Sequence, residues 1–255
     1  MARQKLSVTI ITCNEETRIR AALKSAVWAD EIVVVDSGST DQTLEICREY
    51  TQHVFQEPWH GYVEQKNIAT ARCLHDWVLN IDADEIISTG LAAEIQEIFT
   101  CGPTHAGYMI PRRTYYLGAW IRHCGWYPDK KLRLFNKQQG RWTGQMLHEK
   151  VQVEGTTASL QHDLYHYTYE NIEDHLKTIN TYTSIAASHK QGSITAAGIL
   201  GHTLFTFFKK YLIKQGFRDG GRGLIVSLLS AFSVAVKYAK LWELRHVPQE
   251  EKRLT

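Results

Sequence analysis

Two kinds of apolar pattern alternate along the first 85 residues. Short runs rich in β-branched residues predict strands at residues 6–11, 31–35, 53–55 and 76–81. Between these runs, apolar residues recur at helical spacing and predict helices at residues 17–28, 43–50 and 65–74. The resulting order, β-α-β-α-β-α-β, predicts a parallel sheet with right-handed crossovers.

Acidic and amide side chains follow three of these strands. Asn14 and Glu15 come after the first strand, Asp36 ends the second, and Asp82 and Asp84 follow the fourth. Carboxyl ends of parallel strands meet at one edge of a sheet, where ligands bind. Two carboxylates at i and i+2 can converge on Mg²⁺ or Mn²⁺, which prefer oxygen ligands and share them with substrate phosphates. Any one of these acids could be a solvated turn residue, but three strand ends together argue for a site.

Four linked motifs in this part of the chain resemble the family 2 glycosyltransferases of the GT-A fold. They are TCNEE at 12–16, VVVDSGSTD at 33–41, QKN at 65–67 and DADE at 82–85. Three later stretches resemble the bacterial lipopolysaccharide inner-core β-1,4-glucosyltransferase group: KLRLF at 131–135, LHEKV at 147–151 and GFRDG at 216–220. This second resemblance covers nearly the whole chain. It implies a UDP-sugar donor, a divalent cation and inversion at the anomeric carbon.

The resemblance also implies which residues contact the nucleotide sugar. Asp36 would accept the N3–H of a uracil ring, and Glu15 would reach the base or the ribose. Lys66 would face the diphosphate as a point charge, unless it is an ordinary surface lysine. The full set of expected donor contacts is Thr12, Asn14, Glu15, Asp36, Ser37, Lys66 and Asp82.

The cation would be held at the paired acids. Asp84 is the expected direct ligand, and Asp82 would contact the metal or the ribose, whereas Glu85 is interpreted as structural. GT-A enzymes often complete the metal shell with a histidine from the end of the domain, which makes His166 the candidate here. A buried structural histidine is the alternative for His166.

Inverting transfer needs one base that takes the proton from the attacking hydroxyl, and a carboxylate fits. The candidates are Glu149 and Asp129. Glu149 is preferred because it follows a predicted strand and has a histidine neighbour, His148. Asp129 follows a proline and can instead cap a turn.

The second half of this domain is predicted to contain strands at 106–111 and 131–135. In the latter, charged and apolar residues alternate, so its charged residues are expected to face water. Aromatic residues are dense at 115–120 and 126–127, where loops are expected. They would either stack on sugar rings or form core.

The C-terminal part differs in pattern and charge. Helical spacing predicts helices at 171–189, 200–212 and 223–236. Residues 196–255 contain ten Lys/Arg and four Asp/Glu, so this part is basic, whereas the preceding residues carry a net negative charge. The uncharged stretch 223–236 is shorter than the roughly 20 residues that a spanning helix needs. Broad apolar faces with basic and aromatic ends predict helices in a membrane interface; packing on the domain or a second subunit is the alternative.

Composition narrows the class of protein. The chain has 255 residues, 44% of them hydrophobic, which is enough for one core and an appendage. Its five cysteines are scattered without a C-x-x-C pair, which argues against a disulfide framework or zinc ribbon and for a reducing compartment. The N-terminus leads directly into a strand with no apolar signal region.

The expected fold is therefore α/β, of the GT-A type with a Rossmann-like, mostly parallel sheet and a C-terminal helical appendage. Residues 1–168 would form the nucleotide-sugar-binding and catalytic domain, and 169–255 a helical region that docks on the membrane and acceptor. The expected activity is metal-dependent, inverting transfer of a sugar, by resemblance glucose, from a UDP-sugar to the heptose of a lipid-linked inner-core oligosaccharide. We expect a peripheral location on the cytoplasmic face of the bacterial inner membrane and no nucleic-acid partner; the oligomeric state stays open.

Three alternatives remain at this point. The nearest is a family 2 enzyme acting on a polyprenyl phosphate or another surface-glycan acceptor; the polyprenyl class is marked by a pair of long spanning helices at the C-terminus, which are missing here. A nucleotidyltransferase would have a Gly-rich loop after the first strand in place of TCNEE. A carbohydrate-binding module would not need acids at three strand ends.

Overall fold

The computed structural model describes residues 3–144 and 149–247. The chain forms two compact units. The first comprises Met1–Arg113 and Pro128–Tyr167, and the second comprises Thr114–Tyr127 and Thr168–Thr255. The segment Thr114–Tyr127, which the sequence assigns to the catalytic domain, thus groups with the C-terminal helices.

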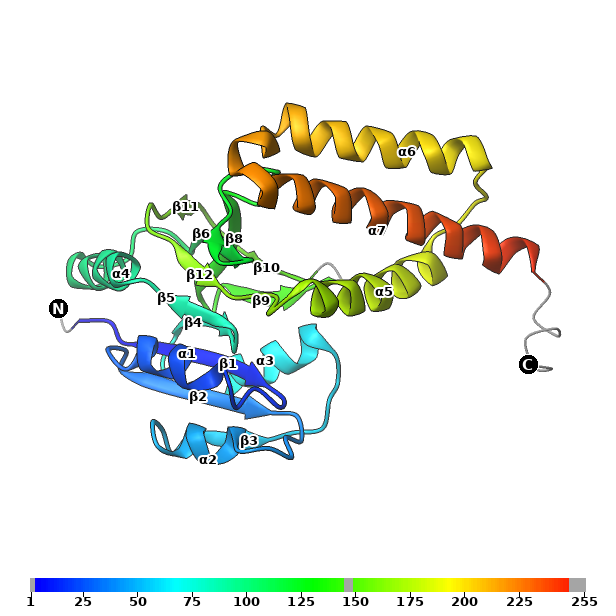
Figure 1. The fold of residues 1–255 in the computed structure, drawn as a ribbon. Helices are drawn as coiled ribbons and strands as arrows, with labels where there is room; N and C mark the ends of the chain where they lie inside the picture. The colour runs from blue at the N-terminus through cyan, green and yellow to red at the C-terminus, as the bar shows by residue number, and fades with distance from the viewer. Residues whose placement is uncertain (1–2, 145–148, 248–255) are drawn as a thin grey trace. The chain divides into compact units, whose positions relative to one another are not determined.

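The first half of the first unit is a parallel sheet. Its strands lie in the order β3 (Val54–Gln56), β2 (Glu31–Asp36), β1 (Leu6–Thr12) and β4 (Trp77–Asp82). The connecting helices are α1 (Ile19–Ala26), α2 (Thr43–Arg48) and α3 (Tyr62–Arg72) (Figure 1). The predicted order is confirmed, and Thr12 pairs with Asp36 while Ile11 pairs with Asp82, so the acids reach one edge.

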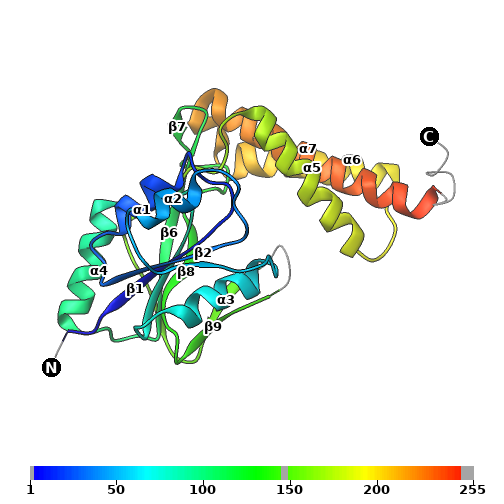
Figure 2. The same ribbon diagram turned by 90° about the horizontal axis from the view of Figure 1, so that it is seen from below.

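Helices cover both faces of this sheet, which explains why β1, β2 and β4 are buried along almost their whole length. Residues of α1, α2 and α4 (Thr89–Cys101) share the main core with β1, β2 and β4. On the opposite face, Ala69 of α3 packs against Ile11 and Val35. Ser88 caps the start of α4, and its side chain accepts the Leu91 N–H. Figure 2 shows α1 and α2 on one side of the parallel strands and α3 on the other.

The second half of the sheet is mixed. The strand β8 (Asp129–Asn136) lies antiparallel beside β4, and then come β6 (Gly107–Tyr116), β12 (Leu164–His166) and β5 (Glu85–Ile87). The short strand β11 (Thr157–Ser159) pairs with β6, while β9 (Gly140–Thr143) and β10 (Lys150–Val153) form a separate ribbon. The predicted α/β fold is confirmed, with the parallel arrangement confined largely to the first half. From β6 to β12 the described part of the chain contains strands joined by loops and no crossover helix, which lets neighbouring strands run antiparallel.

The aromatic stretch at 115–120 forms a hairpin instead of the predicted loop. Tyr115 pairs with Trp120 at the end of β6 and the start of β7 (Ala119–Trp120). Leu117 and Gly118 form the two-residue turn, with φ of 48° and 79°. Such turns need positive φ at both positions, where Leu is rare. The pattern of residues therefore gave little sign of this hairpin.

The part of the second unit that the structure describes contains three long helices. They are α5 (Ile172–His189), α6 (Ala196–Phe208) and α7 (Gly220–His246), with α6 and α7 side by side and antiparallel (Figure 1). Between α6 and α7 lie the π-helical turn η1 (Lys209–Ile213) and the 3₁₀ turn η2 (Gly216–Asp219). The helical segment Gly216–His246 is long and apolar enough to cross a membrane by length and composition.

A buried aromatic cluster joins α5 to the hairpin within this unit. Tyr116, Trp126, Tyr169 and His175 pack together, and the Tyr116 hydroxyl lies 2.9 Å from Nδ1 of His175. Burial lowers the pKa of His175 to about 4 and raises the pKa of Tyr116 to about 12. These aromatics are core, which was one of the two interpretations of the sequence.

The GFRDG stretch at 216–220 has a structural role in the second unit. A Cβ on Gly216 would lie 2.9 Å from the Lys210 carbonyl oxygen, and one on Gly223 would overlap the Gly216 carbonyl. Asp219 accepts the His123 backbone N–H at 2.8 Å, and its other oxygen lies 2.8 Å from Nδ1 of the same residue. The motif therefore ties the hairpin segment to the start of α7.

Candidate active site

The loops after β1 and β2 are hydrogen-bonded to each other. Asn14, which has a φ of 55°, accepts the Thr40 N–H at 2.8 Å and donates its own N–H to Ser39 Oγ at 2.8 Å. The Ser37 N–H donates to the Thr12 carbonyl at 2.9 Å. Three of the predicted nucleotide contacts, Thr12, Asn14 and Ser37, therefore lie in one loop assembly at the carboxyl edge of the sheet.

Asp36 organises this assembly. It is fully buried, and its Oδ2 accepts the N–H groups of Gly38 and Ser39, both at 2.9 Å, while Oδ1 accepts the Ser39 hydroxyl. Glu15 starts the next segment, where its N–H donates to Thr43 Oγ1 at 2.8 Å. The Asp36 carboxylate is thus held in a fixed orientation at the strand end.

Unpartnered polar atoms lie beside the same loops. Among the residues that the structure describes, Thr12 Oγ1 and Gln65 Oε1 are buried with no hydrogen-bond partner. The Gln65 Nε2 donates to Ser37 Oγ at 3.0 Å, so its amide borders the loop assembly. Buried polar groups are normally paired, and a bound nucleotide would offer the donors and acceptors that these atoms lack.

The QKN motif contacts three different parts of the site. Successive residues of a helix point about 100° apart, and Gln65 turns to Ser37 while Lys66 turns to Asp82. Asn67 forms two hydrogen bonds with the backbone of Trp142, at 3.0 and 3.1 Å. Because α3 makes all of these contacts, it joins the nucleotide loops to the acids and to β9.

Lys66 is buried, with 1% of its surface exposed. Its Nζ lies 3.0 Å from Asp82 Oδ1, 3.7 Å from Glu149 Oε1 and 4.6 Å from the ring centroid of Trp142. A buried ammonium group needs such partners. The lysine is therefore not a surface residue, and it brings the first acid of DADE close to the preferred catalytic base.

Arg133 binds the other oxygen of Asp82. Its Nη2 lies 2.6 Å from Asp82 Oδ2, and Nη1 donates to Asn80 Oδ1 at 2.9 Å. Burial alone would raise the pKa of Asp82, but the charges of Arg133 and Lys66 outweigh it and hold this pKa well below its usual range. The prediction that charged residues of 131–135 face water is wrong for Arg133, which is 4% exposed because its face of β8 meets the acids of β4 and β5.

Glu85 completes this buried cluster of charges. It is fully buried, its Oε2 accepts the Asp82 N–H at 2.9 Å, and its Oε1 lies 3.2 Å from Arg133 and 3.3 Å from Arg112. The last residue of DADE therefore holds the backbone of the first. These contacts fit the structural role expected for Glu85.

Asp129 lies at the far end of the same cluster. It begins β8 rather than capping a turn, and Arg112 donates to its Oδ2 from Nη2 at 2.7 Å and from Nε at 3.1 Å. Lys131 lies 3.2 Å from its other oxygen. Burial raises the pKa of Asp129, but the charges of Arg112 and Lys131 outweigh it and lower the pKa. A carboxylate held in this way is a weak base.

Glu149 is held less tightly. Among the residues that the structure describes, its ion-pair partner is Lys66, with Nζ 3.7 Å from Oε1, and its side chain is about a quarter exposed. The neighbouring His148, which could bond Glu149 or line an acceptor pocket, lies outside the described residues. Between the two candidate bases, this geometry favours Glu149.

Asp84 and His166 come together as the sequence suggested. The strand β12 pairs with β5, so His166 lies opposite Glu85, and His166 Nε2 is 3.3 Å from Asp84 Oδ2. A carboxylate oxygen and an imidazole nitrogen are suitable ligands for Mn²⁺, and the carboxylate also suits Mg²⁺. Within residues 3–144 and 149–247, no three His, Cys, Asp or Glu side chains converge as a metal cluster. The two carboxylate oxygens of Asp82 contact Lys66 and Arg133.

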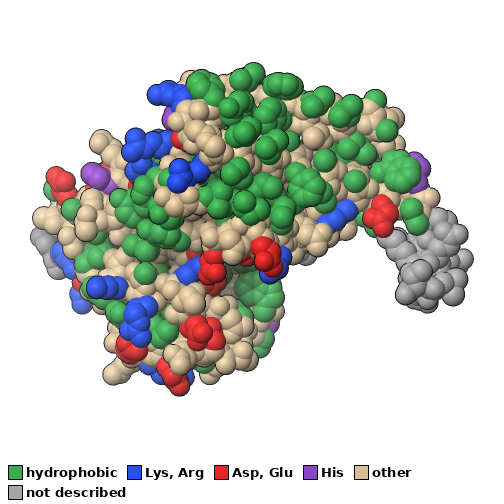
Figure 3. Space-filling view, viewed as in Figure 1, with side chains coloured by type: hydrophobic (Ala, Val, Ile, Leu, Met, Phe, Trp, Pro, Cys, Tyr) green, Lys and Arg blue, Asp and Glu red, His purple; other side chains and the backbone are tan. Residues whose placement is uncertain are grey.

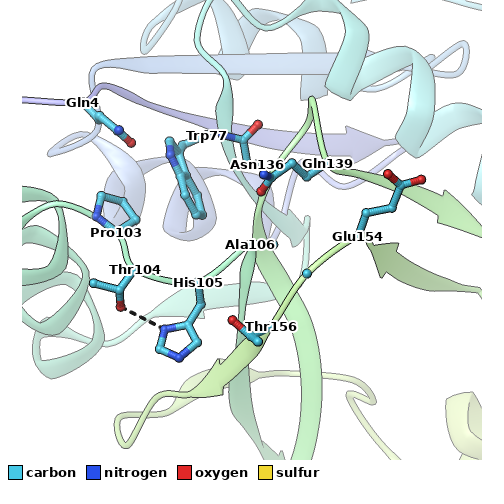
Figure 4. Close-up of a pocket in the computed structure, with 11 residues that line it drawn as sticks. Gln4, Trp77, Pro103, Thr104, His105, Ala106, Asn136, Gln139, Glu154 and Thr156 are labelled. Atoms are coloured by element: carbon cyan, nitrogen blue, oxygen red, sulfur yellow. Dashed lines mark hydrogen bonds between the residues drawn. The ribbon is translucent and has the colours of Figure 1, made fainter.

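A shallow pocket of about 380 Å³ lies at the other edge of the sheet. Gln4 precedes β1, Trp77 begins β4 and Asn136 ends the antiparallel β8, so these lining residues mark the amino ends of the parallel strands (Figure 4). None of the predicted site residues lines it. The pocket is therefore separate from the candidate active site.

Comparison with known proteins assigns the family. Residues 7–152 match the family described as Glycosyl transferase family 2. An uncharacterized glycosyltransferase of Rickettsia typhi is 34% identical over 94% of this chain and 88% of its own length. The chain belongs to glycosyl transferase family 2. The resemblance found in the four N-terminal motifs is thereby confirmed.

Other relatives of this family 2 glycosyltransferase extend the comparison. The lipopolysaccharide core biosynthesis glycosyltransferase LpsC of Rhizobium meliloti is 29% identical over 94% of this chain and 93% of its own length. Among solved structures, S. aureus TarS 1–349 in complex with UDP-GlcNAc has a TM-score of 0.48 at 14% identity and covers 95% of this chain and 92% of that one. Glucosyl-3-phosphoglycerate synthase from Mycobacterium tuberculosis with Mg²⁺ and UDP has a TM-score of 0.36 at 25% identity, covering 45% and 44%. The assignment rests on the family match and the sequence relatives.

Sequence reasoning missed two residues of this glycosyltransferase site. They are Arg133, which the sequence pattern places in water, and Arg112. Both contact Glu85, and each also contacts one of the predicted acids, Asp82 or Asp129. The KLRLF stretch that resembles the inner-core group contains Arg133. That resemblance was the available signal, because a run of alternating charges does not reveal a buried partner.

Replacing Arg133 by Met should destabilise this glycosyltransferase strongly. The change leaves Glu85 and Asp82 short of one cation in a buried cluster, and breaking a buried ion pair costs about 3–5 kcal/mol. Urea unfolding followed by circular dichroism would measure the loss as a lower midpoint with an unchanged slope. The matched control is Arg20→Met, which breaks an exposed pair with Glu49 and should change little. Equal midpoints for the two variants would show that the cluster contributes no more than a surface pair.

Proposed function

We propose that this glycosyltransferase moves a hexose, by resemblance glucose, from a UDP-sugar to the heptose of a lipopolysaccharide inner core, with inversion. The observation that carries the proposal is the meeting of three elements at one sheet edge. The loop assembly around Asp36 offers a nucleotide site, and the pair Asp84–His166 offers metal ligands. Lys66 contacts both Asp82 and Glu149, so it places Glu149 beside the DADE motif.

The donor would bind along the carboxyl ends of β1, β2 and β4. Asp36, held by the Gly38 and Ser39 amides, would accept from the uracil ring, and Glu15 would bond the base or ribose. The unpartnered Thr12 Oγ1 and Gln65 Oε1 would also face the nucleotide. Asp84 and His166 would hold Mg²⁺ or Mn²⁺, with Asp82 nearby orienting Lys66. When bound, such a cation neutralises negative charge on a leaving diphosphate.

Glu149 would act as the base. Its carboxylate takes the proton from the heptose hydroxyl as the hydroxyl oxygen bonds to the anomeric carbon and the bond from that carbon to the UDP oxygen breaks. A single displacement of this kind inverts the anomeric centre. Glu149 is preferred to Asp129 as the base because Arg112 and Lys131 already hold Asp129 and lower its pKa.

The acceptor and location follow from the relatives and from the second unit. LpsC is named for lipopolysaccharide core biosynthesis, which supports a core oligosaccharide acceptor. An acceptor anchored in a bilayer cannot diffuse to a soluble enzyme, so the enzyme would work as a peripheral protein on the cytoplasmic face of the inner membrane. The basic, apolar second unit supports that location.

The test is a panel of donors and acceptors with purified full-length protein. With Mn²⁺, we expect release of UDP from UDP-glucose to exceed release from UDP-GlcNAc or of GDP from GDP-mannose by at least tenfold, and we expect EDTA to stop it. Inner-core lipopolysaccharide lacking its outer sugars should be labelled, whereas polyprenyl phosphate should not. Labelling of polyprenyl phosphate alone would favour the alternative acceptor class.

A further inference from the structure

One surface of the second unit is both apolar and exposed. It follows α6, η1 and η2, and we call it the α6 face. Its side chains are each between 48% and 68% exposed: Leu200, Leu204, Phe205, Phe208, Leu212, Ile213 and Phe217. Figure 3 shows hydrophobic side chains gathered over α6 and the adjoining α7. Continuous exposed apolar surfaces of this kind mark binding sites.

The sequence and the local backbone both produce this face. Leu200, Leu204, Phe208 and Leu212 are four residues apart and form one helical stripe, and α6 contains no buried residue. The helix then widens into the π-turn, where the Lys214 N–H donates to the Lys209 carbonyl at 2.7 Å.

Basic residues surround the α6 face, and acids are almost absent from it. Residues 191–242 contain seven Lys/Arg and a single acid, Asp219. The segment from η1 to η2 carries exposed Lys209, Lys214 and Arg218, next to the exposed Leu212 and Ile213. The Asp219 carboxylate is occupied by the backbone and ring of His123. This surface therefore complements a negatively charged apolar partner.

The long helix α7 has the length to span a bilayer, but its contacts argue for lying flat. Lys240 donates to Asn180 Oδ1 at 2.7 Å, to Ser184 Oγ at 2.8 Å and to Thr183 Oγ1 at 3.0 Å, all on α5. A spanning α7 would either lose its packing on α5 or carry charged residues of α5, which include Glu173, Asp174 and Lys177, into hydrocarbon, where charge is costly. A dimer through the α6 face would bring together two sets of lysines with hardly any carboxylate to pair with them.

From these observations we propose that the α6 face inserts into the headgroup–acyl boundary of an anionic lipid bilayer. Leu212, Ile213 and Phe217 enter the apolar layer, and Lys209, Lys214 and Arg218 contact lipid phosphates. This inference rests on the peripheral location proposed above and deepens it, because it names the inserting surface and the lipid charge. Its test measures lipid binding and does not depend on transfer.

The apolar part of the proposal is tested with L212S/I213S/F217S in full-length protein. Vesicles of 30% phosphatidylglycerol in phosphatidylethanolamine at 0.1 M NaCl would be sedimented with each protein. We expect the variant to lose at least tenfold in partition coefficient. The matched control is V27S/L74S, which removes side chains 59% and 71% exposed in the first unit and should bind like the parent. A second variant, L204S/F208S, repeats the test on α6 should the first not fold. Parent-like binding by the folded variants overturns the proposal.

The basic part is tested with K209Q/K214Q against K5Q/K24Q, in which both sites are exposed lysines of the first unit. On anionic vesicles at 0.1 M NaCl the first variant should partition at least tenfold less than the second, and the difference should shrink at 0.5 M NaCl. Zwitterionic phosphatidylcholine vesicles should bind the parent and both variants alike. Equal loss in both variants on anionic vesicles would contradict a localised contact.

Further outcomes distinguish a lipid bilayer from other partners of the α6 face, and they distinguish failure of this inference from failure of the proposed function. If light scattering shows that the parent is a dimer and that L212S/I213S/F217S is a monomer, and the parent does not bind vesicles, the α6 face is a subunit contact. This result would overturn the proposal. Cellular membranes that retain the protein at alkaline pH until detergent is added would indicate a spanning α7, which also overturns it. Vesicle binding with the expected variant pattern supports the α6 face even where UDP-sugar hydrolysis is absent; that absence counts only against the proposed function.

Discussion

Changing Asp84 to Asn should remove metal-dependent UDP binding and lower transfer roughly 10³-fold. A bound cation contributes several kcal/mol of charge stabilisation, and each 1.36 kcal/mol is tenfold in rate. Asp84 lies 3.3 Å from His166, and the Asp82 carboxylate is engaged by Lys66 and Arg133. Because the neighbouring acid is neutralised internally, little remains to replace the lost ligand. Calorimetry with UDP, in the presence and absence of Mn²⁺, measures the effect directly.

The matched control for this variant is Asp76→Asn. Asp76 is an exposed acid just before β4, at the opposite end of the strand, where it accepts a bond from Gln138. Its loss should leave UDP affinity and its Mn²⁺ dependence unchanged. If Asp84→Asn still binds UDP in an Mn²⁺-dependent way, Asp82 and Asp84 are turn residues rather than metal ligands.

The second large effect is expected for Glu149→Gln. This variant should keep donor affinity but lose at least ~10² in turnover, the contribution of a general base. Because the amide is nearly isosteric and the Lys66 ammonium lies as far as 3.7 Å from Glu149, the fold should tolerate the change. Single-turnover transfer to inner-core lipopolysaccharide would give the rate, and UDP titration would give the affinity.

Asp129→Asn is the companion to Glu149→Gln. Asp129 is bound by Arg112 and Lys131, so its replacement should mainly lower stability by loosening these contacts, with a smaller effect on turnover of the folded protein. A 10²-fold loss of turnover in Asp129→Asn together with normal turnover in Glu149→Gln would reverse the assignment of the base.

The parallel half of the sheet could be predicted from sequence because local pattern and tertiary environment agree there. The run at 32–35 is apolar on both faces, and the structure covers it on both faces with helices. The common location of Asp36 and Asp82 can then be predicted, because the carboxyl ends of parallel strands lie at one edge of the sheet. Boundaries of these strands and helices differ from the predicted ones by only a few residues at most ends.

The remainder of the site depends on partners far apart in sequence. Arg133 and Glu85 are 48 residues apart, and they meet because β8 inserts between β4 and β6. Alternating charge on a strand is compatible with either a wet face or a buried ion cluster, and only the neighbouring strands decide. The hairpin at Leu117–Gly118 escaped prediction because its turn uses a leucine at positive φ.

The helical region was predicted in outline but with a shorter last helix. The uncharged run 223–236 was expected to end in the basic and aromatic residues up to Trp242, whereas α7 continues to His246. The helix continues because Lys240 binds α5 and Tyr238 packs on His202. Lys240, which follows the uncharged run in the sequence, thus forms a contact between two helices.

The QKN motif makes α3 sensitive to insertion in a way that substitution would not reveal. Gln65, Lys66 and Asn67 face three directions and hold the nucleotide loop, the acids and the backbone of Trp142. One residue inserted between Tyr62 and Gln65 would turn all three side chains by about 100° at once. Each of the three side chains would then face a different neighbour and lose its contact, although every residue type would still be present. The helical register of residues 65–67, rather than any one side chain, therefore keeps the donor site and the catalytic site aligned.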